Sequence, residues 1–248
     1  MAETFPLYAG SGRFELRRRL GAGGMGIVYE AFDRERNALV ALKTIHARDA
    51  ASLLRFKHEF RALAHIAHPH LVALHELFAG DDGWYFTMEL LDGVALDAYA
   101  TDDTRLRTAL AQLAQGVHAL HQAGRLHCDL KPTNMLVTAE PRAVLVDFGV
   151  IAEIGNARTR SIDDDAFVVG TPPYMAPEQA RGEITPASDW YAFGGVLFQL
   201  LTGTVPFRGS ARGILVDKNR LDAPAVRSLA PGAPADLAQL ADALLARD

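Results

Sequence analysis

The sequence predicts an α+β fold in two parts, the first built on a sheet and the second mostly helical. Five runs of β-type residues and one helical pattern precede residue 90, and the longest helical patterns follow it. With 248 residues, of which 49% are hydrophobic, the chain is long enough to bury a sizeable core. This length allows one large domain or two lobes, and residues 1–12 are expected to be a flexible tail.

Composition and charge exclude several classes of protein. A net charge of −5 gives no general attraction to nucleic acid. No apolar run approaches the ~20 residues needed to cross a bilayer, and the N-terminus lacks the pattern of a signal peptide. The single cysteine, Cys128, excludes an internal disulfide and fits a reducing compartment. We expect a cytoplasmic protein with no nucleic-acid partner and no membrane segment in this chain.

A glycine-rich segment follows the first predicted strand. Residues 14–20 alternate as a strand does, and glycines at positions 21, 23 and 26 then leave backbone N–H groups free to approach phosphates. This pattern alone is weak, because dinucleotide-binding loops share it. Such a loop leads into a helix, whereas this one leads into a β-type run at residues 27–29. A plain glycine hairpin needs no cation downstream, yet Lys43 follows the next apolar run, so we favour a phosphate-binding loop.

One helix and two further strands complete the predicted first part. Phe56, Phe60 and Leu63 fall on one face of a helix over residues 52–64, with Glu59 beside them. One interpretation of Glu59 is a solvated helix charge, but the order of the residues along the chain favours a pair with Lys43. Residues 71–78 and 84–90 predict the strands. Four histidines lie between residues 65 and 75, but no cysteine is near to complete a familiar zinc site, so we expect none.

The most informative stretch is a predicted turn near the middle of the chain. Asp129, Lys131 and Asn134 place an acid, a cation and an amide within six residues, and Asp147 follows. Short β-type runs on both sides of the intervening loop would hold Asn134 and Asp147 side by side. Two oxygen ligands that converge in this way suit Mg²⁺, which prefers carboxylates, water and substrate phosphates. The pattern predicts a phosphoryl-transfer centre.

Three helices are predicted in the second part. Residues 104–122 carry leucines and a valine at helical spacing, followed by Gly124 as a C-terminal cap. Residues 186–202 are apolar on all sides, which indicates a buried helix. An Ala- and Leu-rich helix is expected over residues 235–246, behind Pro234.

These motifs together resemble the protein kinase superfamily. The order of Asp129, Lys131 and Asn134, then Asp147-Phe148-Gly149, then Ala176-Pro177-Glu178 is similar to that of bacterial-type (eukaryotic-like) serine/threonine protein kinase catalytic domains. The resemblance extends from about residue 14 to residue 248. It implies a two-lobed kinase fold with ATP bound in the cleft. The N-terminal lobe, residues 13–90, would hold a five-stranded antiparallel sheet with one helix, and the C-terminal lobe, residues 91–248, would be mostly helical.

The resemblance also implies roles for residues of the turn. Asp129 would be the catalytic base, and Lys131 would neutralise the moving γ-phosphoryl group. Asn134 and Asp147 would hold Mg²⁺. Thr171, in a substrate-docking loop over residues 170–178, would hydrogen-bond Asp129 and Lys131.

By the same resemblance, the first part would bind the nucleotide. Lys43 would contact the α- and β-phosphates and pair with Glu59, a pair that switches the enzyme as the helix moves. Met88 would guard the back pocket, and the backbone of Glu89 and Leu91 would meet the adenine edge. The full set of implied nucleotide-binding residues is Leu20, Gly21, Gly23, Gly26, Val28, Ala41, Lys43, Met88, Glu89, Leu91 and Leu136.

Two departures from the family pattern carry expectations of their own. Cys128 stands where the family more often has an arginine that grips a phosphate on the activation segment. We therefore expect activity without phosphorylation of residues 150–171, and we expect Cys128 to be a small packing residue. The chain ends before the helix that usually supplies an arginine partner for Glu178. This predicts a truncated fragment of a longer multidomain protein, less stable than an extended version. Asp189 would brace the catalytic turn.

The predicted function is transfer of the γ-phosphoryl group of ATP, with Mg²⁺, to serine or threonine hydroxyls of proteins, including the protein itself. A nucleotide-binding pseudokinase that acts as a scaffold is the alternative. Loss of the lysine, base or metal ligands would indicate it, and all are present. A small-molecule phosphotransferase shares the core chemistry, but the docking loop argues against it.

Overall fold

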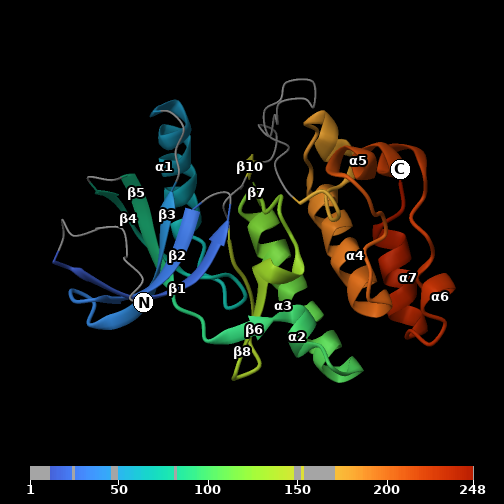
Figure 1. Cartoon of the computed structure of the whole chain (residues 1–248), viewed down its shortest axis with the longest axis horizontal. Coiled ribbons are helices and arrows are strands. Elements are labelled where there is room, and N and C mark those ends of the chain that lie inside the picture. The colour runs from blue at the N-terminus through green and yellow to red at the C-terminus, as the bar shows by residue number, and fades with distance from the viewer. Residues whose placement is uncertain are drawn as a thin grey trace. The chain divides into compact units, whose positions relative to one another are not determined.

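The computed structural model describes residues 12–23, 26–45, 50–80, 83–147, 152–153 and 171–247 (Figure 1). These residues form two compact units that divide between Asp92 and Gly93. Several predictions fall outside the described residues: most of the expected tail, part of the glycine-rich loop, Phe148-Gly149, and most of the expected activation segment. Within the described residues, no helix is both long and apolar enough to cross a membrane.

The first unit contains the predicted five-stranded antiparallel sheet. Its strands lie in the order β1-β2-β3-β5-β4, and every neighbouring pair is antiparallel. The strands are β1 (Phe14–Gly23), β2 (Gly26–Asp33), β3 (Ala38–Ile45), β4 (Leu74–Gly80) and β5 (Gly83–Glu89). The predicted start of β4 at residue 71 was three residues too early. Leu71 and Val72 are buried apolar residues that precede the strand, and an apolar run alone does not mark where pairing begins.

Helix α1 (Ala50–Ala64) packs on this sheet through the predicted face, and it is the one helix among the described residues of this unit. The rings of Phe56 and Phe60 lie 5.9 and 5.5 Å from that of Phe86 on β5, measured between centroids. Phe60 and Leu63 are buried. The periodicity of the sequence therefore identified the packed face of this helix.

The second unit is mostly helical, as predicted. Its helices are α2 (Leu96–Tyr99), α3 (Asp103–Gln122), α4 (Pro186–Thr202), α5 (Ala211–Arg220), α6 (Val226–Leu229) and α7 (Ala235–Leu244). The bounds of α4 match the prediction at both ends, where Pro186 opens the helix and Gly203 adopts the left-handed conformation after it (φ 74°). Helix α7 ends at Leu244, two residues before the predicted end.

Helix α4 is closely packed within this unit. In Figure 1, α4 (orange) and α7 (red) lie side by side, and an added Cβ on Gly194 of α4 would come within 2.7 Å of the Cβ of Leu244. Ten residues of α4 are buried. This helix is therefore a rigid support for the loops that pack against it.

Short strands and turns carry the chain between these helices. A small sheet has the order β6-β8-β9, with strands β6 (Gly93–Ala95), β8 (Met135–Thr138) and β9 (Ala143–Leu145). A second pair joins β7 (Arg125–Leu126) to β10 (Ala152–Glu153). Two 3₁₀ segments are η1 (Pro132–Asn134) and η2 (Pro177–Arg181). The β8–β9 hairpin continues directly from η1 and so sets the position of the turn that precedes it.

Candidate active site

The catalytic turn, residues 127–134, runs from the end of β7 through η1 to the start of β8. Met135 pairs with Leu145 in the β8–β9 hairpin, and the N–H of Val146 donates to the carbonyl oxygen of Asn134 at 2.9 Å. Asn134 and Asp147 therefore lie at the same end of the hairpin, as the β-type runs predicted.

Three of the predicted site residues, Thr171, Lys131 and Asn134, converge on the carboxylate of Asp129. The hydroxyl of Thr171 donates to Oδ1 at 2.8 Å, and Nζ of Lys131 lies 2.7 Å from Oδ2. Nδ2 of Asn134 donates to Oδ2 at 3.2 Å and to the backbone oxygen of Asp129 at 2.9 Å. Three donors leave room for another on a carboxylate with about four lone-pair sites. With 12% of its side chain exposed, Asp129 is accessible to an incoming hydroxyl.

The oxygen atoms near this carboxylate fit a divalent metal. Because Nδ2 of Asn134 points to Asp129, its Oδ1 is directed elsewhere, and no hydrogen bond among the described residues uses that oxygen. Asp147 brings a carboxylate to the same end of the hairpin. An amide oxygen and a carboxylate are ligands that suit Mg²⁺.

Two residues of the site hold a left-handed backbone without being glycine. Cys128 has φ 65° and Asp147 has φ 66°. Such conformations cost about 1–3 kcal/mol each, persist only where the surroundings fix them, and cluster at functional sites. At Cys128 this support comes from Asp189, which accepts its N–H, and from Gln179, which donates to its carbonyl oxygen.

Asp189 of α4 braces the catalytic turn, as predicted. Its side chain is 1% exposed and accepts the backbone N–H groups of His127 and Cys128, both at 2.8 Å. Nε2 of His121 on α3 lies 2.9 Å from the same carboxylate. Three donors compensate the cost of burying this charge, and His121 is a partner that the sequence did not identify.

His127 links the turn to the hairpin. Its side chain is fully buried, and burial lowers the pKa of the imidazole below its ordinary value. Nε2 lies 3.3 Å from the carbonyl oxygen of Val146. A neutral ring that donates from Nε2 satisfies this carbonyl, so His127 is a structural member of the site.

Gln179 joins the catalytic turn to the loop that carries Thr171. Its Oε1 accepts the N–H of Ala176 at 2.8 Å, and its Nε2 donates to the carbonyl oxygen of Cys128 at 3.3 Å. Nearby, the hydroxyl of Ser188 donates to Glu178 at 2.5 Å. Glu178 therefore has a hydrogen-bond partner in this chain; its lack of an arginine stays a prediction.

The first unit positions the residues expected to bind phosphates. Lys43 on β3 is 5% exposed and pairs in register with Val28 on β2 and Phe86 on β5. Gly26 has φ 144°, and a Cβ there would lie 1.9 Å from the carbonyl oxygen of Thr44. Packing thus demands glycine at 26, whereas a Cβ on Gly21 would meet open space. The Lys43–Glu59 pair stays a prediction.

A model of the protein kinase domain matches residues 14–246 of this chain. The chain belongs to the protein kinase family. The kinase domain is 33% identical to the serine/threonine-protein kinase PrkC of Bacillus subtilis (strain 168), over 90% of this chain and 36% of that protein. It is 34% identical to the serine/threonine-protein kinase PknE of Mycobacterium tuberculosis, over 95% of this chain and 42% of that protein.

A further relative supports the same grouping. The serine/threonine-protein kinase PknH of Mycobacterium tuberculosis is 33% identical over 95% of this chain and 38% of that protein. The kinase domain thus resembles bacterial serine/threonine kinases, and its family uses ATP and a divalent metal. This chain spans less than half the length of these relatives.

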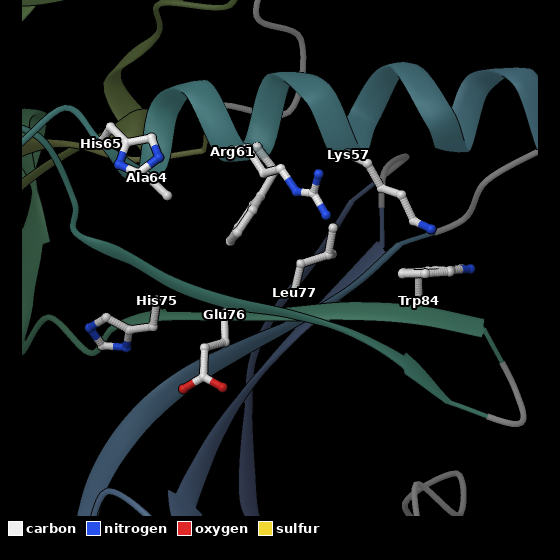
Figure 2. Close-up of a pocket in the computed structure, with 9 residues that line it drawn as sticks. Lys57, Arg61, Ala64, His65, His75, Glu76, Leu77 and Trp84 are labelled. Atoms are coloured by element: carbon white, nitrogen blue, oxygen red, sulfur yellow. The ribbon is translucent and has the colours of Figure 1, made fainter.

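The kinase domain also has a pocket of about 470 Å³ between α1 and the strands β4 and β5 (Figure 2). Lys57 points toward Trp84, with Nζ 3.9 Å from a ring centroid, and Glu76 points away from the helix. The lining includes none of the residues predicted to bind nucleotide or to act on a hydroxyl. Every residue that lines this pocket belongs to the first unit, whereas the catalytic turn belongs to the second.

Proposed function

We propose that this kinase domain transfers the γ-phosphoryl group of ATP to serine or threonine hydroxyls of proteins. The observation that carries the proposal is the convergence of Thr171, Lys131 and Asn134 on the carboxylate of Asp129. A carboxylate held by three donors has a fixed direction. It is suited to orient one hydroxyl for attack, which is the main contribution of a protein to phosphoryl transfer.

In the proposed reaction, Asp129 orients the acceptor hydroxyl and takes its proton as the oxygen attacks phosphorus. The new O–P bond forms in line with the bond that breaks between the γ-phosphorus and the bridging oxygen, and ADP leaves. Lys131 compensates negative charge on the group in transit. Mg²⁺, when held by Asn134 and Asp147, would neutralise charge on the phosphate oxygens.

By family resemblance, we assign binding of the nucleotide to the remaining predicted residues. Lys43 would contact the α- and β-phosphates, with Glu59 orienting it. Buried Ala41 lies on the same strand, two residues before Lys43, so both side chains occupy one face of β3. We assign adenine and phosphate contacts to Leu20, Gly21, Gly23, Gly26, Val28, Ala41, Met88, Glu89, Leu91 and Leu136.

The reaction is tested by transfer of label from ATP to a generic basic protein and to the kinase itself. Asp129→Asn keeps the shape of the side chain but removes the base, so transfer should fall by about 10²–10⁴. Glu140→Gln removes an exposed carboxylate from the β8–β9 loop and should leave transfer unchanged. Label transfer that Asp129→Asn leaves intact would come from a contaminating kinase.

The same assay separates a kinase from a pseudokinase. A pseudokinase would bind ATP, seen as a rise in melting temperature, without transferring label. The relatives are named serine/threonine-protein kinases and give the pseudokinase no support. We further propose protein substrates, autophosphorylation, a cytoplasmic site of action where ATP is available, and a place in a longer multidomain protein.

A further inference from the structure

Lys218 on α5 is the one lysine or arginine of the second unit that is almost fully buried within the described residues. Its side chain is 1% exposed. Burying a cationic side chain is costly unless its donors are satisfied, and lysine is almost never buried without partners. The contacts that hold it there therefore need an explanation.

The ammonium of Lys218 donates to two backbone carbonyls of one loop. Nζ lies 2.7 Å from the oxygen of Pro173 and 2.6 Å from the oxygen of Met175. The rings of Tyr191 and Phe207 lie 5.1 and 6.0 Å from Nζ, so aromatic faces cover the cation.

The loop gripped in this way is the docking turn, residues 171–175. The N–H groups of Tyr174 and Met175 both point to the carbonyl oxygen of Thr171, at 2.9 and 3.2 Å. At its start, the Thr171 hydroxyl contacts Asp129. The docking turn is thus held at one end by the proposed base and at the other by Lys218.

Apolar packing supports the same attachment. Leu215, one turn before Lys218 on α5, packs with Met175 and Ala180. This packing alone would bring α5 against the docking turn. A methionine at 218 would fill much of the same space, so the ammonium adds something that packing does not, namely two directed hydrogen bonds.

We propose that Lys218 is a positioning residue for the protein substrate. Its side chain orients the docking turn, whose first residue, Thr171, contacts the proposed base Asp129, so the peptide beside the acceptor hydroxyl would meet this turn. The inference rests on the proposed kinase function, because it assigns a role in binding the protein substrate. It predicts an effect on the KM for peptide without an equal effect on ATP.

The test compares Lys218→Met with Arg220→Met. Arg220 is an exposed cation on the same helix, and no described contact joins it to the docking turn. We expect Lys218→Met to raise the KM for peptide by about tenfold or more, because both hydrogen bonds that hold the docking turn to α5 are lost. The KM for ATP should stay close to wild type, and Arg220→Met should change neither KM.

A second measurement reports on the stability of the docking turn independently of catalysis. Amide hydrogen exchange at Tyr174 and Met175 should be about tenfold faster in Lys218→Met and unchanged in Arg220→Met, because these N–H groups close the turn. Lys218→Arg keeps the donors and should restore part of the peptide affinity. If Lys218→Met does not fold, Lys218→Gln, which keeps one donor group, is measured in the same way.

The possible outcomes separate this inference from the kinase proposal. Wild-type peptide KM and wild-type exchange in a folded Lys218 variant would overturn it, as would equal rises in KM for peptide and for ATP. If the wild type transfers no label, the kinase proposal fails. Exchange then decides whether Lys218 holds the docking turn, and unchanged exchange would refute that too.

Discussion

Gln179 donates a hydrogen bond from Nε2 to the carbonyl oxygen of Cys128, with 3.3 Å between the two atoms. Its other amide atom accepts the N–H of Ala176 at 2.8 Å. One buried amide thus ties the backbone of the catalytic turn to the segment that follows the docking turn. Both of its polar atoms are used, and these two bonds are made to backbone groups.

Replacing Gln179 by glutamate keeps the acceptor for Ala176 but turns a carboxylate oxygen toward the carbonyl of Cys128. We expect the free energy of unfolding to fall by about 1–3 kcal/mol, because a buried acceptor loses its donor. We also expect kcat to fall, since the catalytic turn loses its hydrogen bond from Gln179. Chemical denaturation and label transfer measure the two effects. Gln115→Glu, on an exposed position of α3, is the control and should change neither.

Removing the hydroxyl of Thr171 should slow phosphoryl transfer. Thr171→Val has nearly the same shape but loses the hydrogen bond to Asp129 and the acceptor for Lys131. We expect kcat to fall by about tenfold, which corresponds to one hydrogen bond to a charged group. Thr171→Ser keeps the hydroxyl and should retain most of the activity. Equal losses in both variants would show that the methyl group, not the hydroxyl, matters.

The sequence predicted those parts of the site whose signal is local. Asp129, Lys131 and Asn134 lie within six residues, so their spacing alone indicated a shared site. Both ends of helix α4 were predicted correctly because a proline opens the helix and a glycine follows it. Periodicity likewise identified the buried face of α1.

Lys218 and Gln179 could not be predicted in this way. Their partners are backbone carbonyls, which every residue carries, and an N–H group, which all residues but proline carry, so no side-chain pattern marks them. Lys218 reaches carbonyls more than forty residues away, and Gln179 reaches a turn fifty-one residues away. Only the fold brings such groups together. In the sequence Lys218 looks like any charged residue of a surface helix.

The presence of Cys128 predicts that kinase activity does not depend on phosphorylation of the activation segment. The residue is 4% exposed, packs with Leu126 and Ile184, and offers no cation to a phosphate. Phosphatase-treated protein should therefore transfer label to a peptide at close to the untreated rate, with mass spectrometry confirming removal of phosphate. Activity that phosphatase abolishes and autophosphorylation restores would contradict this.

The charge of Lys218 makes the stability of the domain depend on pH in a defined direction. Burial lowers the pKa of its ammonium from 10.5 to about 7, with Glu178 partly opposing the effect. Burial raises the pKa of the neighbouring Tyr191 hydroxyl, which therefore stays neutral in the same range. Between pH 7 and about 10 the unfolded chain binds a proton at Lys218 that the folded chain has lost.

The free energy of unfolding contributed by this group should therefore rise with pH above 7, by up to about 1.4 kcal/mol per pH unit. Lys218→Met shares every other titrating group with the wild type, so the difference between their unfolding free energies isolates the lysine. That difference should move in favour of the wild type from pH 7 to pH 9.5, because the folded protein no longer bears a buried charge. The docking turn keeps its contacts over this range, since a neutral amine still has two N–H donors for the two carbonyls. A difference that stays constant with pH would show that Lys218 remains charged in the folded state.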